Sequence, residues 1–255
     1  MLSVTPIPAL SDNYIWLMRQ DDSNRVAVID PGDAAPVIEL IEREALTLDA
    51  ILITHHHHDH TGGVGELKQR YRPHIYGPDN PSIDGIDTPL SDGDQCSVLG
   101  RRFEVMTTPG HTLDHISYFA AGIPALLFCG DTLFFGGCGR LFEGSPEQMH
   151  ASLTRLATLP DDTLVFAAHE YTLANLRFAK AADPENPHLD TVIAQCQALR
   201  DQDRPTLPSH LGTEREINPF LRSHETALQA SAAHHGETDS PLATFATLRA
   251  WKDNF

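Results

Sequence analysis

The chain has 255 residues, 41% of them hydrophobic and 21% charged, which is typical of a soluble globular protein. This length allows one large domain, or one domain with a smaller appendage. The formal net charge of −17 argues against nucleic acid or an anionic membrane surface as the main partner.

The N-terminal part of the chain predicts strands and helices in alternation. Two apolar, β-rich runs are separated by the polar residues 21–24, a spacing typical of a hairpin. Residues 35–45 carry apolar side chains at a helical period, and a short apolar run at 51–53 indicates a buried strand. The predicted elements are strands at 14–18 and 26–29, a helix at 35–45, a strand at 51–53 and a helix at about 63–72.

A block of imidazoles and one carboxylate follows the strand at 51–53. It runs from His55 through His58 to Asp59 and His60. So many ionisable groups beyond a strand end would repel one another if protonated, and a divalent metal relieves this because it takes neutral imidazole and carboxylate as ligands. The alternative is a histidine-rich surface tract or a tag, but tags lie at termini and carry no interleaved aspartate.

The middle of the chain returns to strands, and three of them end at a potential ligand. Strands are predicted at 103–107, 116–119, 125–129 and 163–167, and a helix begins at Ser145, where Pro146 and Gln148 fit a capping box. His111, Asp131 and His169 follow strand ends. Each one alone reads as a turn or cap residue. Together with the histidine block, they indicate ligands that converge on one metal site.

The chain after residue 172 is predicted to be helical. The expected helices are 173–182, 191–199, 225–233 and 241–251, with proline-containing connectors between them. Cys96, Cys129, Cys138 and Cys196 are scattered without CxxC spacing, which indicates free thiols in a reducing compartment. The first residues show no signal-peptide pattern and no apolar run approaches bilayer length, so we expect a cytoplasmic protein without membrane contact.

These motifs resemble those of the metallo-β-lactamase superfamily, and within it the chain is similar to glyoxalase II, the hydroxyacylglutathione hydrolases. The resemblance covers nearly the whole chain. It is carried by 54–60, 109–112, 130–134, 137–140, 169–172 and the C-terminal residues 249–252, with 12–14 in support. The resemblance implies an α+β fold, an αββα metallo-β-lactamase-type sandwich with a C-terminal α-helical domain. It also implies a catalytic domain at 1–172 and a helical substrate-binding domain at 173–255.

The resemblance further implies a binuclear metal site. It assigns His55, His57 and His111 to one metal, Asp59, His60 and His169 to the second, and Asp131 as the bridge between them. Asp59 and Asp131 are the expected catalytic carboxylates. His56 and His58 fall at variable positions outside the ligand set. We expect two divalent ions, zinc first, with iron or manganese as alternatives.

The implied reaction is hydrolysis of S-(2-hydroxyacyl)glutathione, as in S-D-lactoylglutathione, to glutathione and a 2-hydroxy acid (D-lactate), the second step of methylglyoxal detoxification. A metal-bound hydroxide would attack the thioester and expel a thiolate. There is no GxSxG motif and no cysteine in a recognised nucleophile motif, so we expect no acyl-enzyme. We expect a monomer that acts on this small substrate.

The residues expected to hold glutathione by the same resemblance are Arg140, Phe142, Tyr171, Arg249 and Lys252. Phe142 stands where some relatives have tyrosine, so one substrate hydrogen bond is expected to be absent. Arg249 and Lys252 have an alternative role, because cations are favoured at a helix C-terminus. Asp114 departs from the small residue often found after the motif at 108–112, and we expect only local consequences.

Three other functions are open at this point. A class B β-lactamase usually has a cysteine at the second metal, where this chain has Asp131. A persulfide dioxygenase uses a single iron and needs fewer ligands. A metal-binding scaffold without activity is the third alternative, and the complete set of ligand positions argues against it.

Overall fold

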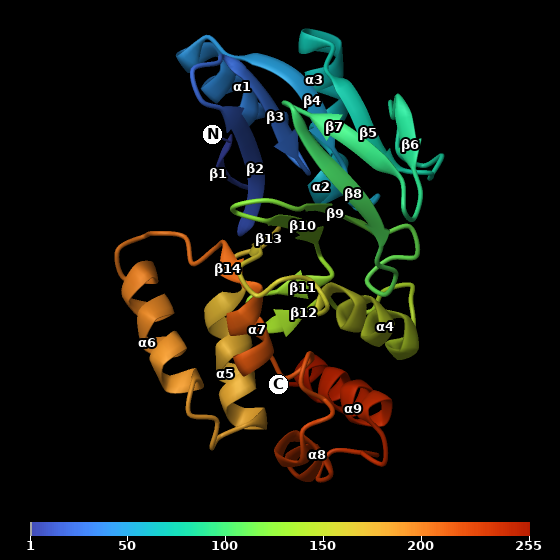
Figure 1. Ribbon diagram of the computed structural model, residues 1–255, viewed down its shortest axis with the longest axis vertical. Coiled ribbons are helices and arrows are strands. Elements are labelled where there is room, and N and C mark those ends of the chain that lie inside the picture. The colour runs from blue at the N-terminus through green and yellow to red at the C-terminus, as the bar shows by residue number, and fades with distance from the viewer. Residues whose placement is uncertain (1) are drawn as a thin grey trace. The chain divides into compact units, whose positions relative to one another are not determined.

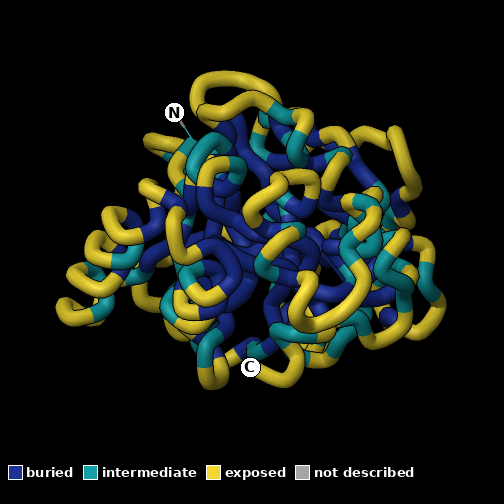
Figure 2. The backbone as a smooth tube through the Cα atoms, turned by 90° about the horizontal axis from the view of Figure 1, so that it is seen from below, coloured by how far each residue is buried: buried dark blue, intermediate teal, exposed yellow. Residues whose placement is uncertain are grey.

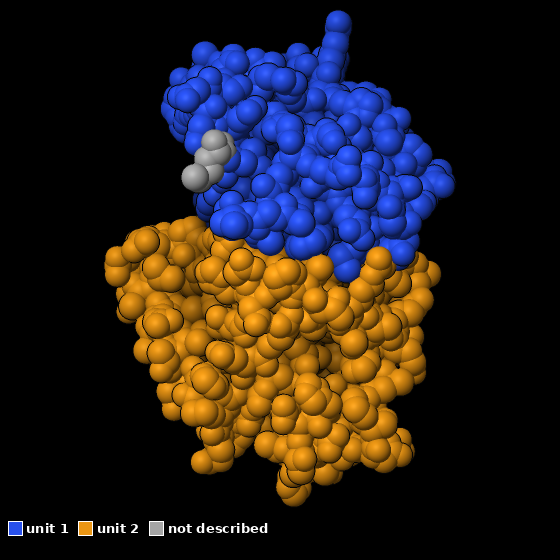
Figure 3. All heavy atoms as spheres, in the orientation of Figure 1, with its two compact units in different colours: residues 1–107, 114–130 blue, residues 108–113, 131–255 orange. Residues whose placement is uncertain are grey.

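The computed structural model describes residues 2–255 and divides into two compact units (Figure 3). Unit 1 comprises the chain up to Thr107 together with Asp114–Gly130. Unit 2 comprises Thr108–Leu113 and Asp131–Phe255. The chain therefore passes between the units more than once. Among the described residues, no helix is both long enough and apolar enough to cross a membrane.

Unit 1 begins with a mixed sheet whose strands follow one another in chain order (Figure 1). The strands are β1 (Leu2–Ala9), β2 (Asn13–Gln20), β3 (Arg25–Ile29), β4 (Thr47–Leu52), β5 (His74–Pro78) and β6 (Thr88–Leu90). The first three strands are antiparallel, and β3 to β6 are parallel. Helices α1 (Ala34–Glu44) and α3 (Val64–Tyr71) make the connections that parallel strands require. Asp33 caps α1 by accepting a hydrogen bond from the Ala35 N–H at 2.9 Å.

An antiparallel set of strands completes unit 1. It consists of β7 (Gln95–Val98), β8 (Arg101–Thr107), β9 (Ile116–Ala120) and β10 (Leu126–Gly130), paired in this order. The Tyr118 hydroxyl donates to the Ile53 carbonyl at 2.8 Å, and the Ile116 N–H donates to the Thr54 carbonyl at 2.9 Å. These bonds fix β9 beside the end of β4, where the histidine block begins.

The core of unit 1 follows from the alternation of side chains along the strands. Ile15 and Leu17 of β2 pack in one apolar cluster with Val37 of α1 and Leu67 of α3. The intervening residues of β2, such as Trp16, point to the opposite face of the sheet and are also buried. Figure 2 shows buried residues in dark blue in the interior and exposed residues in yellow on the outside. The end of β4, residues 50–52, is apolar and buried, which is why this part of the strand could be predicted, whereas Thr47 and Asp49 interrupt the apolar run.

Unit 2 is mainly helical. Its strands are the hairpin β11 (Leu133–Phe134) and β12 (Gly137–Cys138), and the pair β13 (Leu164–Ala167) and β14 (Ser209–His210). Its helices are α4 (Pro146–Leu156), α5 (Thr172–Ala182), α6 (Leu189–Arg200), α7 (Leu211–Ile217), α8 (Thr226–Ala232) and α9 (Pro241–Asp253). Aromatic rings fill its interior. The ring centroids of Phe178 and Phe220 are 5.9 Å apart, and those of Phe220 and Phe245 are 5.7 Å apart.

Most of the predicted elements are present with shifts of one or two residues at their ends, but the strand predicted at 51–53 is part of β4, which begins four residues earlier. The capping box that starts α4 is confirmed, since Ser145 Oγ accepts from the Gln148 N–H and Gln148 Oε1 accepts from the Ser145 N–H. Several elements were not predicted, and most of them are short. They are β1, β5, β6, β7, β11, β12, β14, α7 and α2 (His58–Thr61), the last of which lies inside the histidine block.

Candidate metal centre

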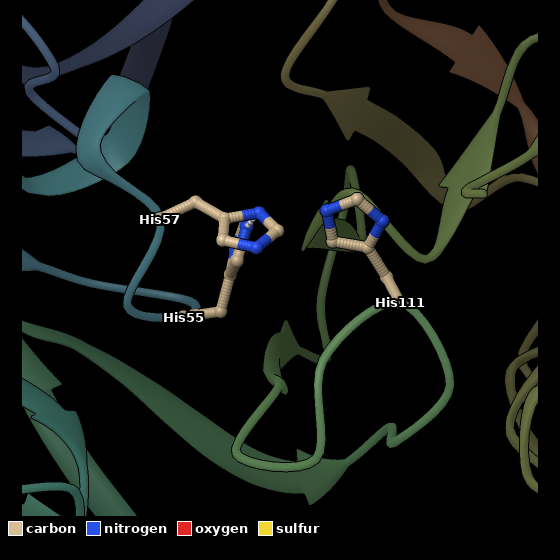
Figure 4. Close-up of side chains that lie close together, drawn as sticks. All are labelled: His55, His57 and His111. Carbon is tan, nitrogen blue, oxygen red and sulfur yellow. Dashed lines mark hydrogen bonds between the residues drawn. The ribbon is translucent and has the colours of Figure 1, made fainter. Parts of the chain in front are cut away.

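The histidine block forms a loop that leaves β4 and turns into the short helix α2. On this loop, His55 Nε2 and His57 Nδ1 lie 3.1 Å apart, and Figure 4 draws both rings together with that of His111. His55 is fully buried, and its ring stacks on that of His115, with the centroids 4.8 Å apart. His115 is therefore a buried packing partner of His55, a role that sequence spacing did not indicate.

Hydrogen bonds fix which nitrogen of His55 carries the proton. The Thr54 hydroxyl donates to Asp30 Oδ2 at 2.7 Å, so its oxygen accepts from His55 Nδ1–H at 3.0 Å. The lone pair of His55 is consequently on Nε2, the nitrogen that faces His57. This tautomer is the one a metal ligand requires.

A second pair on the same loop consists of Asp59 and His60. His60 Nε2 lies 3.4 Å from Asp59 Oδ2, while His60 Nδ1–H donates to the buried Asp30 at 3.0 Å. Asn13 Nδ2 donates to Asp59 Oδ2 at 3.1 Å, which orients this carboxylate. With Nδ1–H donated to Asp30, the Nε2 atom of neutral His60 and the carboxylate of Asp59 are both acceptors, so a cation between them would bind both.

Asp30 is the main residue of this half-site that the sequence did not indicate. Its carboxylate accepts from the Thr54 N–H at 2.8 Å, from the Thr54 hydroxyl and from His60 Nδ1–H. Its backbone adopts a left-handed φ of 52°, which is uncommon for a residue other than glycine. The only sequence signal was an aspartate at the end of a predicted strand, in Asp30-Pro31-Gly32.

Unit 2 supplies His111, Asp131 and His169, which follow β8, β10 and β13. Asp131 lies between the two imidazoles, with Oδ2 3.3 Å from His111 Nε2 and Oδ1 3.3 Å from His169 Nε2. His111 Nδ1–H donates to the Arg140 carbonyl at 2.7 Å, so the lone pair of His111 also faces a carboxylate oxygen. Each oxygen of Asp131 is thus directed at a different imidazole.

The distances between neighbouring ligand atoms fit two ligands of one metal ion better than they fit a hydrogen bond. Charge-assisted N–H···O bonds are about 2.7–2.9 Å long. Two ligands at about 2.0–2.1 Å from one tetrahedral cation lie about 3.3 Å apart. The four pairs within the units are separated by 3.1–3.4 Å: His55 with His57, Asp59 with His60, His111 with Asp131, and His169 with Asp131. The donor set therefore fits divalent cations.

The other two histidines of the block, His56 and His58, are more accessible to solvent than His55 and His60. His58 is exposed on α2. His56 is partly exposed, and its Nδ1 lies 2.9 Å from Asp114 Oδ1.

Three of the expected substrate-binding residues present accessible side chains on unit 2. The Arg140 side chain and Phe142 are each 62% exposed, and Tyr171 is 38% exposed. The ring of Tyr171 stacks on that of His169, with the centroids 4.7 Å apart and the planes within 4°. A substrate group bound by Tyr171 would therefore lie beside a candidate metal ligand.

The remaining two expected substrate-binding residues are on α9 and are less accessible. Arg249 is 6% exposed. Its guanidinium donates to the Cys138 carbonyl at 3.0 Å and to Asp253 at 2.9 Å. Lys252 is partly buried, with Nζ 5.6 Å from the centre of the Phe178 ring, and burial lowers its pKa. Asp253 also lies 3.9 Å from Arg140 Nε, so it connects the buried arginine to the exposed one.

Comparison with known proteins gives two family matches that together cover residues 10–255. Residues 10–169 match the metallo-beta-lactamase superfamily, and residues 170–255 match the hydroxyacylglutathione hydrolase C-terminus. The chain is 63% identical over 255 residues to the hydroxyacylglutathione hydrolase of Chromohalobacter salexigens, with complete coverage of both chains.

Solved structures agree with the superfamily match. The B3 metallo-beta-lactamase BLEG-1 aligns with a TM-score of 0.64 at 25% identity, over 87% of this chain and 99% of that chain. TTHA1623, solved in a di-iron-bound form, aligns with a TM-score of 0.56 at 28% identity, over 65% of this chain and 92% of that chain. The expected metallo-β-lactamase-type fold with a helical C-terminal region is confirmed.

Proposed function

The chain belongs to the hydroxyacylglutathione hydrolase (glyoxalase II) family of the metallo-beta-lactamase superfamily, and from this membership we infer that it hydrolyses the thioester of S-(2-hydroxyacyl)glutathione. We propose S-D-lactoylglutathione as its substrate, with glutathione and D-lactate as products. This reaction would be the second step of methylglyoxal detoxification.

We propose that seven side chains hold two divalent cations. His55, His57 and His111 would bind one cation, Asp59, His60 and His169 the other, and Asp131 both. The observation that carries this assignment is that imidazole lone pairs face carboxylate oxygens at 3.3–3.4 Å, in the pairs His60 with Asp59 and His111 with Asp131. Zinc fits this nitrogen and oxygen donor set, and iron or manganese would fit it as well.

The protein would position the reacting groups around these cations. When bound, two such ions polarise a carbonyl oxygen and lower the pKa of a shared water molecule. Asp131 would be a ligand of both cations. Asp59, whose carboxylate Asn13 orients, would be a ligand of one of them and would help to position the attacking water. The leaving group is a thiolate, so no separate general acid is required.

We propose that unit 2 holds the glutathione moiety. Arg140, Tyr171 and Lys252 would contact it directly, and charged donors suit its two carboxylates. Phe142, 62% exposed, would give it an apolar contact in place of a tyrosine hydroxyl. Arg249 would act through Asp253, which lies within reach of Arg140.

The wider setting is also a proposal. We propose a cytoplasmic monomer with a catalytic domain at 1–172 and a substrate-binding domain at 173–255. The four buried free thiols fit a reducing compartment.

The experiment is an assay of thiol release from S-D-lactoylglutathione, run beside a thioester of the same acyl group on a small thiol. We expect rapid hydrolysis of the glutathione thioester and slow hydrolysis of the small one. A chelator should abolish both reactions. Equal rates on the two thioesters would contradict glutathione recognition, and no thiol release from either would contradict the proposed reaction.

A further inference from the structure

In the row of histidines from His55 to His58, something must determine which imidazoles face the cations. We call this the register of the metal loop. Only His55 and His57 are proposed to bind a metal, but His56 between them carries the same ligand group. The ring centroid of His56 lies 5.0 Å from that of His57 and 6.5 Å from that of His55. These distances place the His56 ring close to the rings of both proposed ligands, so a His56 side chain without a fixed orientation would be a competitor for their cation.

The structure shows what holds His56. Its Nδ1–H donates to Asp114 Oδ1 at 2.9 Å. Asp114 Oδ2 in turn accepts from Asn80 Nδ2 at 2.7 Å, and Asn80 Oδ1 accepts from the Ser82 N–H at 2.9 Å. The carboxylate is well sheltered, since the side chain of Asp114 is 12% exposed and that of His56 is 26% exposed. All of these residues belong to unit 1.

We propose that Asp114 is a positioning residue that fixes the register of the metal loop by holding His56 away from the cations. The proposal rests on the proposed ligand roles of His55 and His57. Both oxygens of Asp114 are used, one for His56 and one for Asn80, so the carboxylate is itself fixed in orientation. A hydrogen bond between His56 and a fixed carboxylate restrains both side-chain torsions of the histidine.

Asp114 can hold His56 only because its side chain is long enough to reach that histidine. It is the residue at which the sequence departs from the small side chain often found after the motif at 108–112. A small side chain at this position would not reach His56. The departure therefore has a specific partner in the metal loop, which lies 58 positions earlier in the sequence.

Cobalt(II) binding tests the proposal, because the visible spectrum of cobalt(II) reports its ligands directly. Metal-free full-length protein would be titrated with cobalt(II), and the spectrum, the stoichiometry and the rate of removal by a chelator would be recorded. The variants are Asp114→Ala, His56→Ala and the double variant. Asp92→Ala is the control, because Asp92 is another hydrogen-bonded aspartate of unit 1 whose carboxylate accepts from the Thr107 N–H at 2.8 Å.

We expect Asp114→Ala to change the spectrum and to speed cobalt removal by about tenfold or more, the usual effect of losing an outer partner of a metal site. His56→Ala and Asp92→Ala should resemble wild type. The double variant should regain the wild-type spectrum, since the competing imidazole is then absent. A merely structural role of Asp114 would not be rescued in this way.

Two outcomes would overturn the register role alone. In the first, wild type binds two equivalents of cobalt and Asp114→Ala behaves identically. In the second, the double variant is as impaired as Asp114→Ala, while thermal denaturation shows that both are folded. If wild type binds no cobalt, the ligand assignment under the proposed function fails, and the register role fails with it.

Discussion

At the scale of single residues, each unit combines ligand candidates with the groups that orient them. His60 Nδ1–H is held by Asp30, and His111 Nδ1–H is held by the Arg140 carbonyl. The ligand candidates could be predicted because their residue types and local spacing are distinctive. Their partners could not, since Asp30 and His60 are 30 residues apart and meet only through the folding of β3 beside β4.

The bridging role of Asp131 gives a prediction about metal content. Asp131→Ala should lower the affinity for both cations, because each of its oxygens faces a different imidazole. His55→Ala should weaken mainly one. Metal content per chain after dialysis is the measurement, with Asp92→Ala as a control. Retention of two tightly bound ions by Asp131→Ala would rule out the bridge.

Glu214 gives a prediction about stability and pH. It is fully buried, accepts from the Gly136 N–H, Ser209 Oγ–H and Asn218 Nδ2–H, and burial raises its pKa to about 7. The folded state therefore keeps a proton that the unfolded state releases above about pH 4.5. The stability that this proton contributes is present below that pH and is lost as pH rises through about 7.

Glu214→Gln should remove this loss, because the amide keeps the shape of the side chain without ionising. Relative to wild type, the variant should gain about 2–4 kcal/mol at pH 8 and little at pH 5. Urea denaturation at both pH values measures the difference. Glu216→Gln is the control, since Glu216 is an exposed residue on the same helix. A difference between wild type and Glu214→Gln that does not change with pH would contradict this account.

At the scale of the elements, segments with a local apolar run or a capping signal could be predicted, and most of those that were missed are short. The apolar end of β4 and the capping box of α4 are such signals, although β4 begins four residues before the strand predicted at 51–53. β1 contains Pro6 and Pro8, which suit only an edge strand and hide the strand pattern. The helix α2 was missed because its four residues, His58–Thr61, are too few to show a helical period.

The contact between the Asp30–Gly32 turn and the metal loop gives a third prediction. A Cβ added at Gly32 would lie 1.8 Å from the Asp59 carbonyl oxygen, so Gly32→Ala must displace the loop that carries Asp59. We expect lower metal content and lower stability. Gly65→Ala is the matched control, because a Cβ there meets nothing within 4 Å and alanine favours the helix α3 by up to about 1 kcal/mol.

Metal content and thermal denaturation would be measured for both glycine variants. If Gly32→Ala binds two metal ions as tightly as wild type, the close packing of this turn on the metal loop is not required for metal binding. If Gly65→Ala is as impaired as Gly32→Ala, the effect is not specific to that turn.

Helix α9 gives a fourth prediction, which separates its buried arginine from an exposed one. Arg249→Ala should cost about 2–3 kcal/mol of stability, because the Cys138 carbonyl and Asp253 each lose a charged donor. Arg140→Ala should leave stability nearly unchanged, since its side chain is 62% exposed, and should raise KM for the glutathione thioester about tenfold or more.

Denaturation curves and steady-state kinetics on both arginine variants are the measurements. A rise in KM for Arg249→Ala at unchanged stability would show that this arginine contacts the substrate itself. An unchanged KM for Arg140→Ala would remove it from the glutathione-binding set.

At the scale of the whole molecule, the fold class and the family followed from motifs spread along the chain. The division at residue 172 stays a prediction. The chain crosses from one compact unit to the other near residues 107, 113 and 130. A single boundary in the sequence therefore does not describe these units. All four thiols are buried, and burial raises the pKa of Cys96, Cys138 and Cys196. This fits a reaction without a cysteine nucleophile.

We propose that the protein hydrolyses a glutathione thioester with two cations, held by seven side chains: His55, His57, Asp59, His60, His111, Asp131 and His169. The most direct measurement is a titration of metal-free protein with zinc, in which thiol release from S-D-lactoylglutathione is followed at each addition. We predict that activity rises until two equivalents per chain are bound and is then constant. Full activity at one equivalent, or activity in the metal-free protein, would contradict the claim.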